Sequence, residues 1–213
     1  MVNPLNKVVV VIPARFASQR LPGKPLKKIA GKSLIQRVHE CAEKMNFVHE
    51  IIVATDDLRI KEAVQSFQGT AVMTDSDLPS GSDRIGAVVK NMDCDIIVNL
   101  QGDEPIVDTH AIDETIHYMI ENPQVEFATL GFPLKHEADY LNPNIVKVLV
   151  DKNRNALYFS RSPIPHYREI DFRENDKLFQ HIGVYLYRKT ALLNFIQWPP
   201  ATLEKIEKLE QLR

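Results

Sequence analysis

The chain has 213 residues, of which 44% are hydrophobic, enough to bury the core of a single domain. A formal net charge of −2 gives no general attraction to nucleic acid or to an anionic membrane surface. The two cysteines, Cys41 and Cys94, predict neither a disulfide framework nor a zinc site. The sequence shows no apolar run near the ~20 residues of a membrane span and no signal peptide. We therefore expect a cytoplasmic protein with no nucleic-acid partner and no membrane insertion.

The first half of the chain alternates short apolar strands with amphipathic helices. Strands are expected at 7–12, 50–54, 70–73 and 95–100, and helices after Ser33, at 59–67 and after Ser82, with both serines as N-caps. This alternation predicts an α/β fold with a mostly parallel central sheet and helices on both faces.

The second half is expected to extend the sheet without long helices. Strands are predicted at 127–133, 145–151, 156–159 and 181–187, and a rigid loop at 162–167, which contains two prolines. We expect one domain over 1–213, whose second half, 123–213, carries a second substrate or a dimer contact. The final segment, 202–213, reads as an amphipathic helix without a stop signal, so we expect the natural chain to continue beyond Arg213.

A cationic loop follows the first strand. Residues 13–39 hold seven Lys or Arg and no Asp or Glu. Ligands of open α/β sheets bind at the carboxyl ends of the strands, so this loop predicts a polyphosphate site. Arg15 offers a planar fork and Lys24 a mobile point charge for a triphosphate and a departing pyrophosphate. Neither a P-loop nor a Gly-x-Gly-x-x-Gly fingerprint is present, and an exposed basic loop is the alternative interpretation.

Three further positions are candidate site residues, and each also has a purely structural interpretation. Asp103 follows a buried strand and faces the predicted cationic edge, which suits Mg²⁺, although Gly-Asp-Glu-Pro is often an ordinary turn. The segment Ser80–Arg84 could read a nucleobase edge or cap a helix. His181 and Tyr185 are expected on one strand face as a pocket wall, unless His181 is a core histidine.

Seven motifs together resemble the 3-deoxy-manno-octulosonate cytidylyltransferase family, also called CMP-KDO synthetases. They are IPARFASQRLPGKPL at 12–26, ATD at 54–56, SGSDR at 80–84, VNLQGDEP at 98–105, ALYFSRSPIP at 156–165, HIGVY at 181–185 and LEQLR at 209–213. The resemblance implies a Rossmann-like nucleotidyltransferase fold with a mixed-sheet extension, and a homodimer. It implies that 1–122 is the nucleotide-binding half and 123–213 the sugar-binding and dimerisation half. It implies transfer of CMP from CTP to 3-deoxy-D-manno-octulosonate (KDO), with Mg²⁺, giving pyrophosphate and CMP-KDO for lipopolysaccharide biosynthesis.

The resemblance also implies residue roles. The nucleotide would contact Ala14, Arg15, Arg20, Lys24, Ser80, Gly81 and Arg84, and the catalytic residues would be Arg15, Lys24 and Asp103, the last also the metal ligand. The sugar would contact Gln101, Arg161, His181, Tyr185, Glu210 and Gln211. In the family a further strand and a Gly-Val-Asp segment with a second metal ligand follow the position of Arg213. The alternatives are a cytidylyltransferase for another sugar acid, such as sialic acid, and a nucleotide-binding protein without catalysis.

Overall fold

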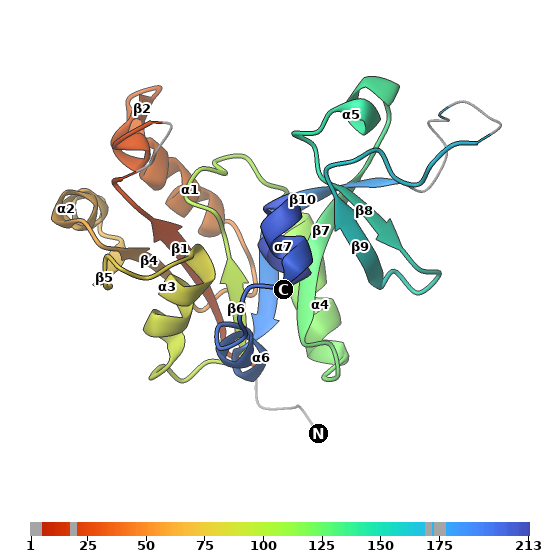
Figure 1. Ribbon diagram of the computed structural model, residues 1–213. Helices are drawn as coiled ribbons and strands as arrows, with labels where there is room; N and C mark the ends of the chain where they lie inside the picture. The colour runs from red at the N-terminus through yellow and green to blue at the C-terminus, as the bar shows by residue number, and fades with distance from the viewer. Residues whose placement is uncertain (1–5, 18–20, 169–171, 173–177) are drawn as a thin grey trace. The chain divides into compact units, whose positions relative to one another are not determined.

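The structure is a computed structural model that describes residues 6–17, 21–168, 172 and 178–213 (Figure 1). The chain groups into two compact units. The first unit comprises Met1–Ala128 and Val184–Ile196, and the second comprises Thr129–Gly183 and Gln197–Arg213. The assignment of 1–122 to the nucleotide and 123–213 to the sugar stays a prediction.

The first unit is built on a mostly parallel sheet. Its strands are β1 (Val8–Ala14), β4 (Glu50–Thr55), β5 (Thr70–Met73), β6 (Ile96–Asn99) and the last residues of β10 (Phe179–Arg188). Their order is β5-β4-β1-β6-β10, with β10 antiparallel and the other pairs parallel. The first five residues of β1 are fully buried, as a central strand covered on both faces requires. The carboxyl ends of β1, β4, β5 and β6 therefore share one edge.

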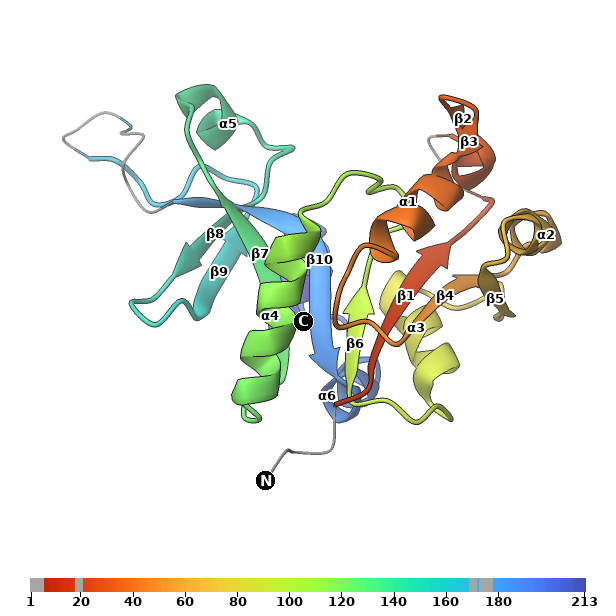
Figure 2. The ribbon, with the colours of Figure 1, turned by 180° about the vertical axis from the view of Figure 1, so that it is seen from behind.

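Helices cover both faces of this sheet. They are α1 (Leu34–Ala42), α2 (Leu58–Ser66), α3 (Gly81–Val89), α4 (Thr109–Glu121) and α6 (Lys189–Phe195). Figure 2 shows α1 and α4 in front of the sheet, while α3 and α6 lie on the other face (Figure 1). The core on the α3 side joins Val9 and Val11 of β1 to Ile85 and Val89 of α3. This arrangement confirms the expected fold class.

Two predictions for the first unit need correction. Ser33 caps α1 as expected, but the N-cap of α3 is Ser80 and not Ser82, which is buried inside the helix. Helix α4 had no counterpart among the predicted elements. Its N-cap, Asp108, follows the Gly-Asp-Glu-Pro turn closely, and Ile112, Ile116 and Met119 form the apolar part of its buried face.

Part of the cationic segment folds locally. A short 3-10 helix, η1 (Lys24–Leu26), is followed by the hairpin of β2 (Lys28–Ile29) and β3 (Lys32–Ser33). The two turn residues of the hairpin, Ala30 and Gly31, both have positive φ, as a tight hairpin turn requires.

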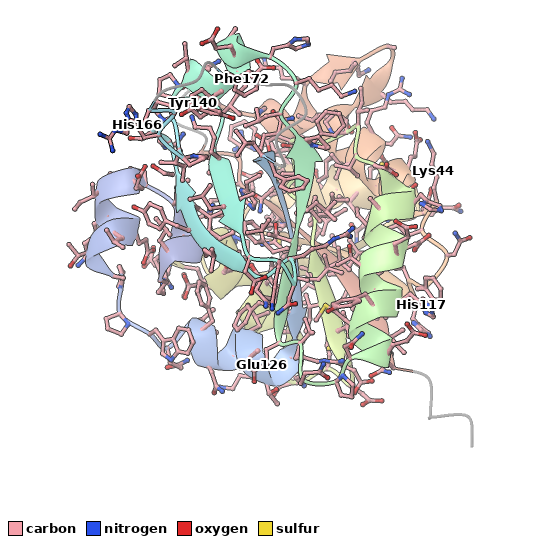
Figure 3. All side chains as sticks on the ribbon, turned by 90° about the vertical axis from the view of Figure 1, so that its right-hand side faces the viewer. Lys44, His117, Glu126, Tyr140, His166 and Phe172 are labelled. Carbon is pink, nitrogen blue, oxygen red and sulfur yellow. The ribbon has the colours of Figure 1, made fainter. Side chains whose placement is uncertain are left out.

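The second unit is antiparallel. It contains β7 (Phe127–Pro133) from Thr129 onward, β8 (Lys147–Val150), β9 (Ala156–Ser160), the first residues of β10 and the helix α5 (Glu137–Leu141). Strand β8 pairs antiparallel with β9 and with β10, which confirms the predicted mixed-sheet extension. An aromatic cluster beside α5 brings the rings of Tyr140 and Phe172 to 5.5 Å (Figure 3).

The predicted helix over 202–213 is interrupted. Helix α7 (Thr202–Glu207) ends at Lys208, which adopts the left-handed conformation, and a 3-10 helix, η2 (Glu210–Leu212), follows. Leu209 is buried with Val148 and Phe159, and this packing explains why the chain turns before it. None of the helices in the described segments is long and apolar enough to cross a membrane.

Candidate functional site

Two segments of the first unit, the start of α3 and the loop after β6, approach Pro13 near the carboxyl end of β1. A Cβ atom added to Gly81 would lie 3.5 Å from the Pro13 ring, and one added to Gly102 only 2.8 Å from the Pro13 carbonyl oxygen. The loop after β6 therefore approaches the β1 backbone so closely that position 102 requires glycine. This contact brings the segments of Arg15, Ser80 and Asp103 to one edge of the sheet.

Arg15 is held by the loop between β5 and α3. Its Nη2 donates to the Leu78 carbonyl and, at 3.3 Å, to the Ser80 carbonyl. Among the described residues none accepts a hydrogen bond from its Nε or Nη1. A half-buried guanidinium that is oriented by carbonyls and keeps free donors suits an anion such as phosphate.

Lys24 and Asp103 face each other, as the sequence led us to expect. The Lys24 Nζ lies 2.6 Å from Asp103 Oδ2, with the two side chains 37% and 51% exposed. An exposed ion pair of this kind contributes less than about 1 kcal/mol, so a bound phosphate or cation can replace it. The structure shows the juxtaposition; the catalytic roles stay predictions.

Arg84 lies beneath this edge and links neighbouring elements. It is fully buried, its Nη2 lies 2.8 Å from Asp56 Oδ2, and its Nη1 donates to the Thr74 hydroxyl. Burial lowers the pKa of Arg84, and the charge of Asp56 opposes that shift. Arg84 thus ties α3 to the ends of β4 and β5. Asp56 and Thr74 were not predicted as site residues, although a carboxylate directly after a strand was visible in the sequence.

The remaining nucleotide candidates fall on the same edge or outside the described residues. The Ser80 hydroxyl accepts from the Asp83 N–H at 3.2 Å and donates to the Asp83 carboxylate at 2.6 Å, so it caps α3. Ala14 is buried at the end of β1. Arg20 lies outside the described residues.

The acidic groups of this edge fit a metal shared with phosphates. In the part of the chain that the structure describes, no cluster of three His, Cys, Asp or Glu could hold a metal. Asp103 is exposed, and burial, followed by the charge of Asp103, raises the pKa of the neighbouring Glu104. One or two carboxylates are what Mg²⁺ takes from a protein when substrate phosphates and water complete its shell. The donor set therefore fits Mg²⁺ brought by a nucleotide.

Gln101 and Tyr185, two sugar candidates, belong to the first unit. Gln101 donates from Nε2 to Asn99 Oδ1 at 3.0 Å, and Tyr185 pairs in register with Asn99. His181 belongs to the second unit, so the expected pocket wall formed with Tyr185 stays a prediction.

His181 is a neutral imidazole in the second unit. Its Nε2 lies 2.9 Å from the Thr129 hydroxyl, which itself donates to the Ile182 carbonyl, and its Nδ1 lies 3.4 Å from Gln211 Nε2. Because the hydroxyl proton goes to Ile182, Nε2 carries the ring proton and Nδ1 accepts. Burial lowers the pKa of His181 to about 4.

Arg161 is oriented by main-chain carbonyls. Its Nε donates to the Glu207 carbonyl at 2.9 Å and its Nη1 to the Pro143 carbonyl at 3.3 Å. The Glu207 carboxylate accepts from the Arg161 N–H at 3.0 Å and from the Ser160 hydroxyl at 2.6 Å. The sequence did not predict Glu207 as a site residue, because its partners are distant in sequence. Glu210, another sugar candidate, lies 3.5 Å from Arg213.

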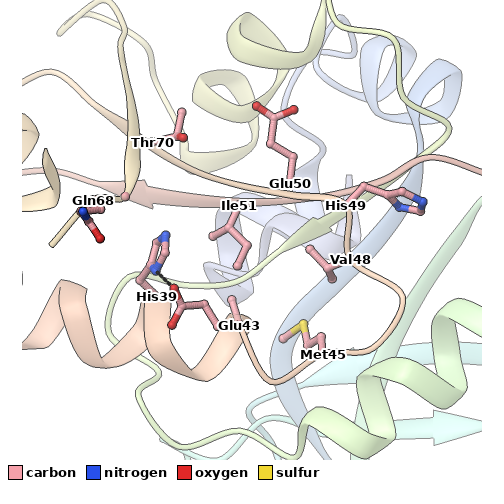
Figure 4. A pocket seen from close by; sticks show the side chains of 11 residues that line it. His39, Glu43, Met45, Val48, His49, Glu50, Ile51, Gln68 and Thr70 are labelled. Atoms are coloured by element: carbon pink, nitrogen blue, oxygen red, sulfur yellow. Dashed lines mark ion pairs between the residues drawn. The ribbon is translucent and has the colours of Figure 1, made fainter.

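A separate hollow of about 320 Å³ lies at the amino ends of β4 and β5 (Figure 4). His39 and Glu43 line it, with His39 Nδ1 3.3 Å from Glu43 Oε1, and Glu50 and Thr70 contribute the first residues of the two strands. Burial lowers the pKa of His39. Two carboxylates, Glu43 and Glu50, are part of its lining, and it lies at the opposite ends of the strands from the cationic edge, so it does not suit a triphosphate.

The parallel sheet with a cationic loop at the carboxyl ends of its strands suits one class of protein, the nucleotidyltransferases. Comparison with known proteins narrows this class. The model of a family described as "Cytidylyltransferase" matches residues 9–213. The 3-deoxy-manno-octulosonate cytidylyltransferases of Syntrophotalea carbinolica and Thermodesulfovibrio yellowstonii are each 46% identical to the chain, covering 97% and 96% of it and 85% and 84% of their own lengths.

A solved structure supports the same family assignment. A CMP:2-keto-3-deoxy-manno-octonic acid synthetase complexed with CTP superposes with a TM-score of 0.91 at 45% identity, over 97% of this chain and 84% of that one. The chain belongs to the 3-deoxy-manno-octulosonate cytidylyltransferase family.

Proposed function

We propose that the chain transfers CMP from CTP to KDO, releasing pyrophosphate and giving CMP-KDO for lipopolysaccharide biosynthesis. The observation that carries this proposal is the match, at 45% identity and a TM-score of 0.91, to a synthetase of that name solved with CTP. The opposed Lys24 and Asp103 support it, because they supply a cation and a carboxylate at one edge of the sheet.

The chemistry is an in-line displacement at phosphorus. The anomeric hydroxyl oxygen of KDO attacks the α-phosphorus of CTP and releases its proton to solvent water. A new O–P bond forms, and the bond to the β-phosphate oxygen breaks with pyrophosphate leaving. Arg15 and Lys24 neutralise the charge that grows on the departing pyrophosphate. Such a reaction depends on positioning and electrostatics more than on covalent participation by the protein.

We assign Asp103 as the residue that would hold Mg²⁺, with Glu104 beside it. When bound, the ion would neutralise phosphate oxygens and so lower the barrier to charge development. Lys24, freed from Asp103, would then turn to the triphosphate.

The second substrate is a sugar acid, and Arg161 is its proposed carboxylate contact. Its guanidinium forms no ion pair with a carboxylate in the described segments, and its orientation is fixed by two carbonyls. The amide and imidazole groups of Gln101, His181 and Gln211, together with Tyr185 and Glu210, suit the hydroxyl groups of a sugar. We further propose a cytoplasmic homodimer on the family resemblance, which sedimentation of the purified protein would test.

The decisive test measures pyrophosphate release from CTP with KDO and, separately, with sialic acid, using the natural full-length protein. We expect turnover with KDO only. Asp103→Asn should reduce kcat by at least about a hundredfold, the scale of losing one electrostatic group, while CTP binding persists in part. Wild-type kinetics in this variant would refute the metal role of Asp103. Release with sialic acid alone would favour the other sugar-acid transferase, and CTP binding without turnover would favour a non-catalytic protein.

A further inference from the structure

A fully buried lysine lies behind Arg161. Lys147, the first residue of β8, is only 1% exposed. Its Nζ donates to the carbonyls of Asn142 at 3.0 Å, Ile145 at 2.8 Å and Arg161 at 2.6 Å. Three acceptors require three N–H donors, which only the protonated ammonium provides. A positive charge is therefore buried at this point.

No carboxylate in the described part of the chain forms an ion pair with this ammonium, which is unusual for a buried charge. Burial lowers the pKa of Lys147, the charge of Glu207 opposes this shift, and the charge of Arg161 adds to it. The Glu207 carboxylate binds the Arg161 N–H and the Ser160 hydroxyl. Lys147 and Arg161 contribute +1 each and Glu207 −1, so the cluster keeps a net charge of +1.

The same contacts fix the position of Arg161. Lys147 binds its carbonyl oxygen, Glu207 binds its N–H with the carboxylate and its Nε with the main-chain oxygen, and Pro143 accepts from its Nη1. The guanidinium is thus held in place inside a cluster that has one positive charge to spare. A cluster of this kind is built to attract one anion.

We propose that Lys147 and Glu207 are positioning residues that set, with opposite signs, the strength of an anion site at Arg161. Lys147 holds the Arg161 segment and adds positive potential, and Glu207 moderates that potential. The anion is a carboxylate of a sugar acid, so the inference rests on the proposed function and deepens it.

The test compares KDO with its C1 carboxamide, which keeps the shape but not the charge. The acid preference is the inhibition constant of the amide divided by the KM for KDO. Lys147→Met should lower the acid preference about tenfold, equivalent to about 1.4 kcal/mol, with the KM for CTP unchanged. Glu207→Gln, which keeps the side-chain volume, should raise it. Lys152→Met, an exposed lysine after β8, is the matched control and should leave it unchanged.

If the two residues had a purely structural role, each variant would bind the acid and the amide more weakly together. The acid preference would then not change in opposite directions in the two variants. The inference is overturned if both variants keep the wild-type acid preference or if both lower it. Should Lys147→Met fail to fold, as judged by its circular dichroism and Tm, Glu207→Gln decides alone: an increase supports the inference, and no increase overturns it. Wild-type protein that does not turn over KDO would overturn the proposed function, whereas normal turnover with an unchanged preference in the variants would overturn only this inference.

Discussion

Single residues of the second unit show how burial sets protonation. His181 lies between the Thr129 hydroxyl and Gln211, and its ring packs 5.1 Å from that of Phe159. Desolvation disfavours the imidazolium, so the ring is neutral at pH 7 and can exchange hydrogen bonds with a ligand without carrying charge. The sequence left a pocket residue and a core histidine as alternatives; the structure shows a half-buried, hydrogen-bonded ring, and the pocket role stays a prediction.

This protonation state predicts that the free energy of unfolding falls at acid pH. The pKa of His181 is about 4 in the folded protein and near 6.5 when unfolded. Between these values the unfolded chain binds a proton that the folded chain does not, so stability is lost as the pH falls from about 6.5 to 4, by up to about 3 kcal/mol. Urea unfolding of wild type and His181→Gln at several pH values measures this loss of stability.

The variant should lose less stability across this window than wild type does. His117→Gln, at an exposed histidine of α4, is the control and should keep the wild-type dependence. Identical pH curves for wild type and His181→Gln would show that the ring titrates normally.

Elements of the first unit are joined through the start of α3. The Ser80 hydroxyl caps the helix, the Ser80 carbonyl accepts from Arg15, and Arg84 one turn later reaches Asp56 and Thr74. The helix start thus links the ends of β1, β4 and β5. Displacement of this element would move Arg15, the first of the predicted phosphate contacts.

Loss of the cap should therefore be measurable. Ser80→Ala leaves one N–H at the start of α3 without its side-chain acceptor, and we expect a loss of about 1 kcal/mol in the free energy of unfolding. Ser66→Ala, at the exposed end of α2, should change it by less than about 0.5 kcal/mol. Chemical denaturation of the two variants gives the comparison, and equal effects would remove the special role of Ser80.

At the scale of the whole molecule, the candidate nucleotide residues lie in the first unit, whereas the candidate contact for the sugar carboxylate, Arg161, lies in the second. Each unit has a hydrophobic cluster of its own, the first between β1 and α3 and the second around Val148 and Phe159. A nucleotide bound to the native first unit should stabilise the folded chain through mass action.

We expect CTP with Mg²⁺ to raise the Tm, because ligand at a hundred times its Kd contributes about 2.7 kcal/mol. UTP at the same concentration should raise it less if the site reads cytosine. Differential scanning calorimetry with each nucleotide measures the shift. No shift with CTP would argue against a nucleotide site at the cationic edge.

Local patterns in the sequence determined the parallel sheet, the cap at Ser33 and the placement of the cationic loop opposite Asp103. These depend on periodicity and on the rule that parallel strands end at one edge. The tertiary structure decided the cap at Ser80, the turn at Lys208, the burial of Arg84 and Lys147, and the hold of Glu207 on Arg161. For Arg84, Lys147 and Glu207 the deciding contacts join residues that are distant in sequence, and neither propensity nor spacing encodes which carbonyl or carboxylate a buried cation will meet.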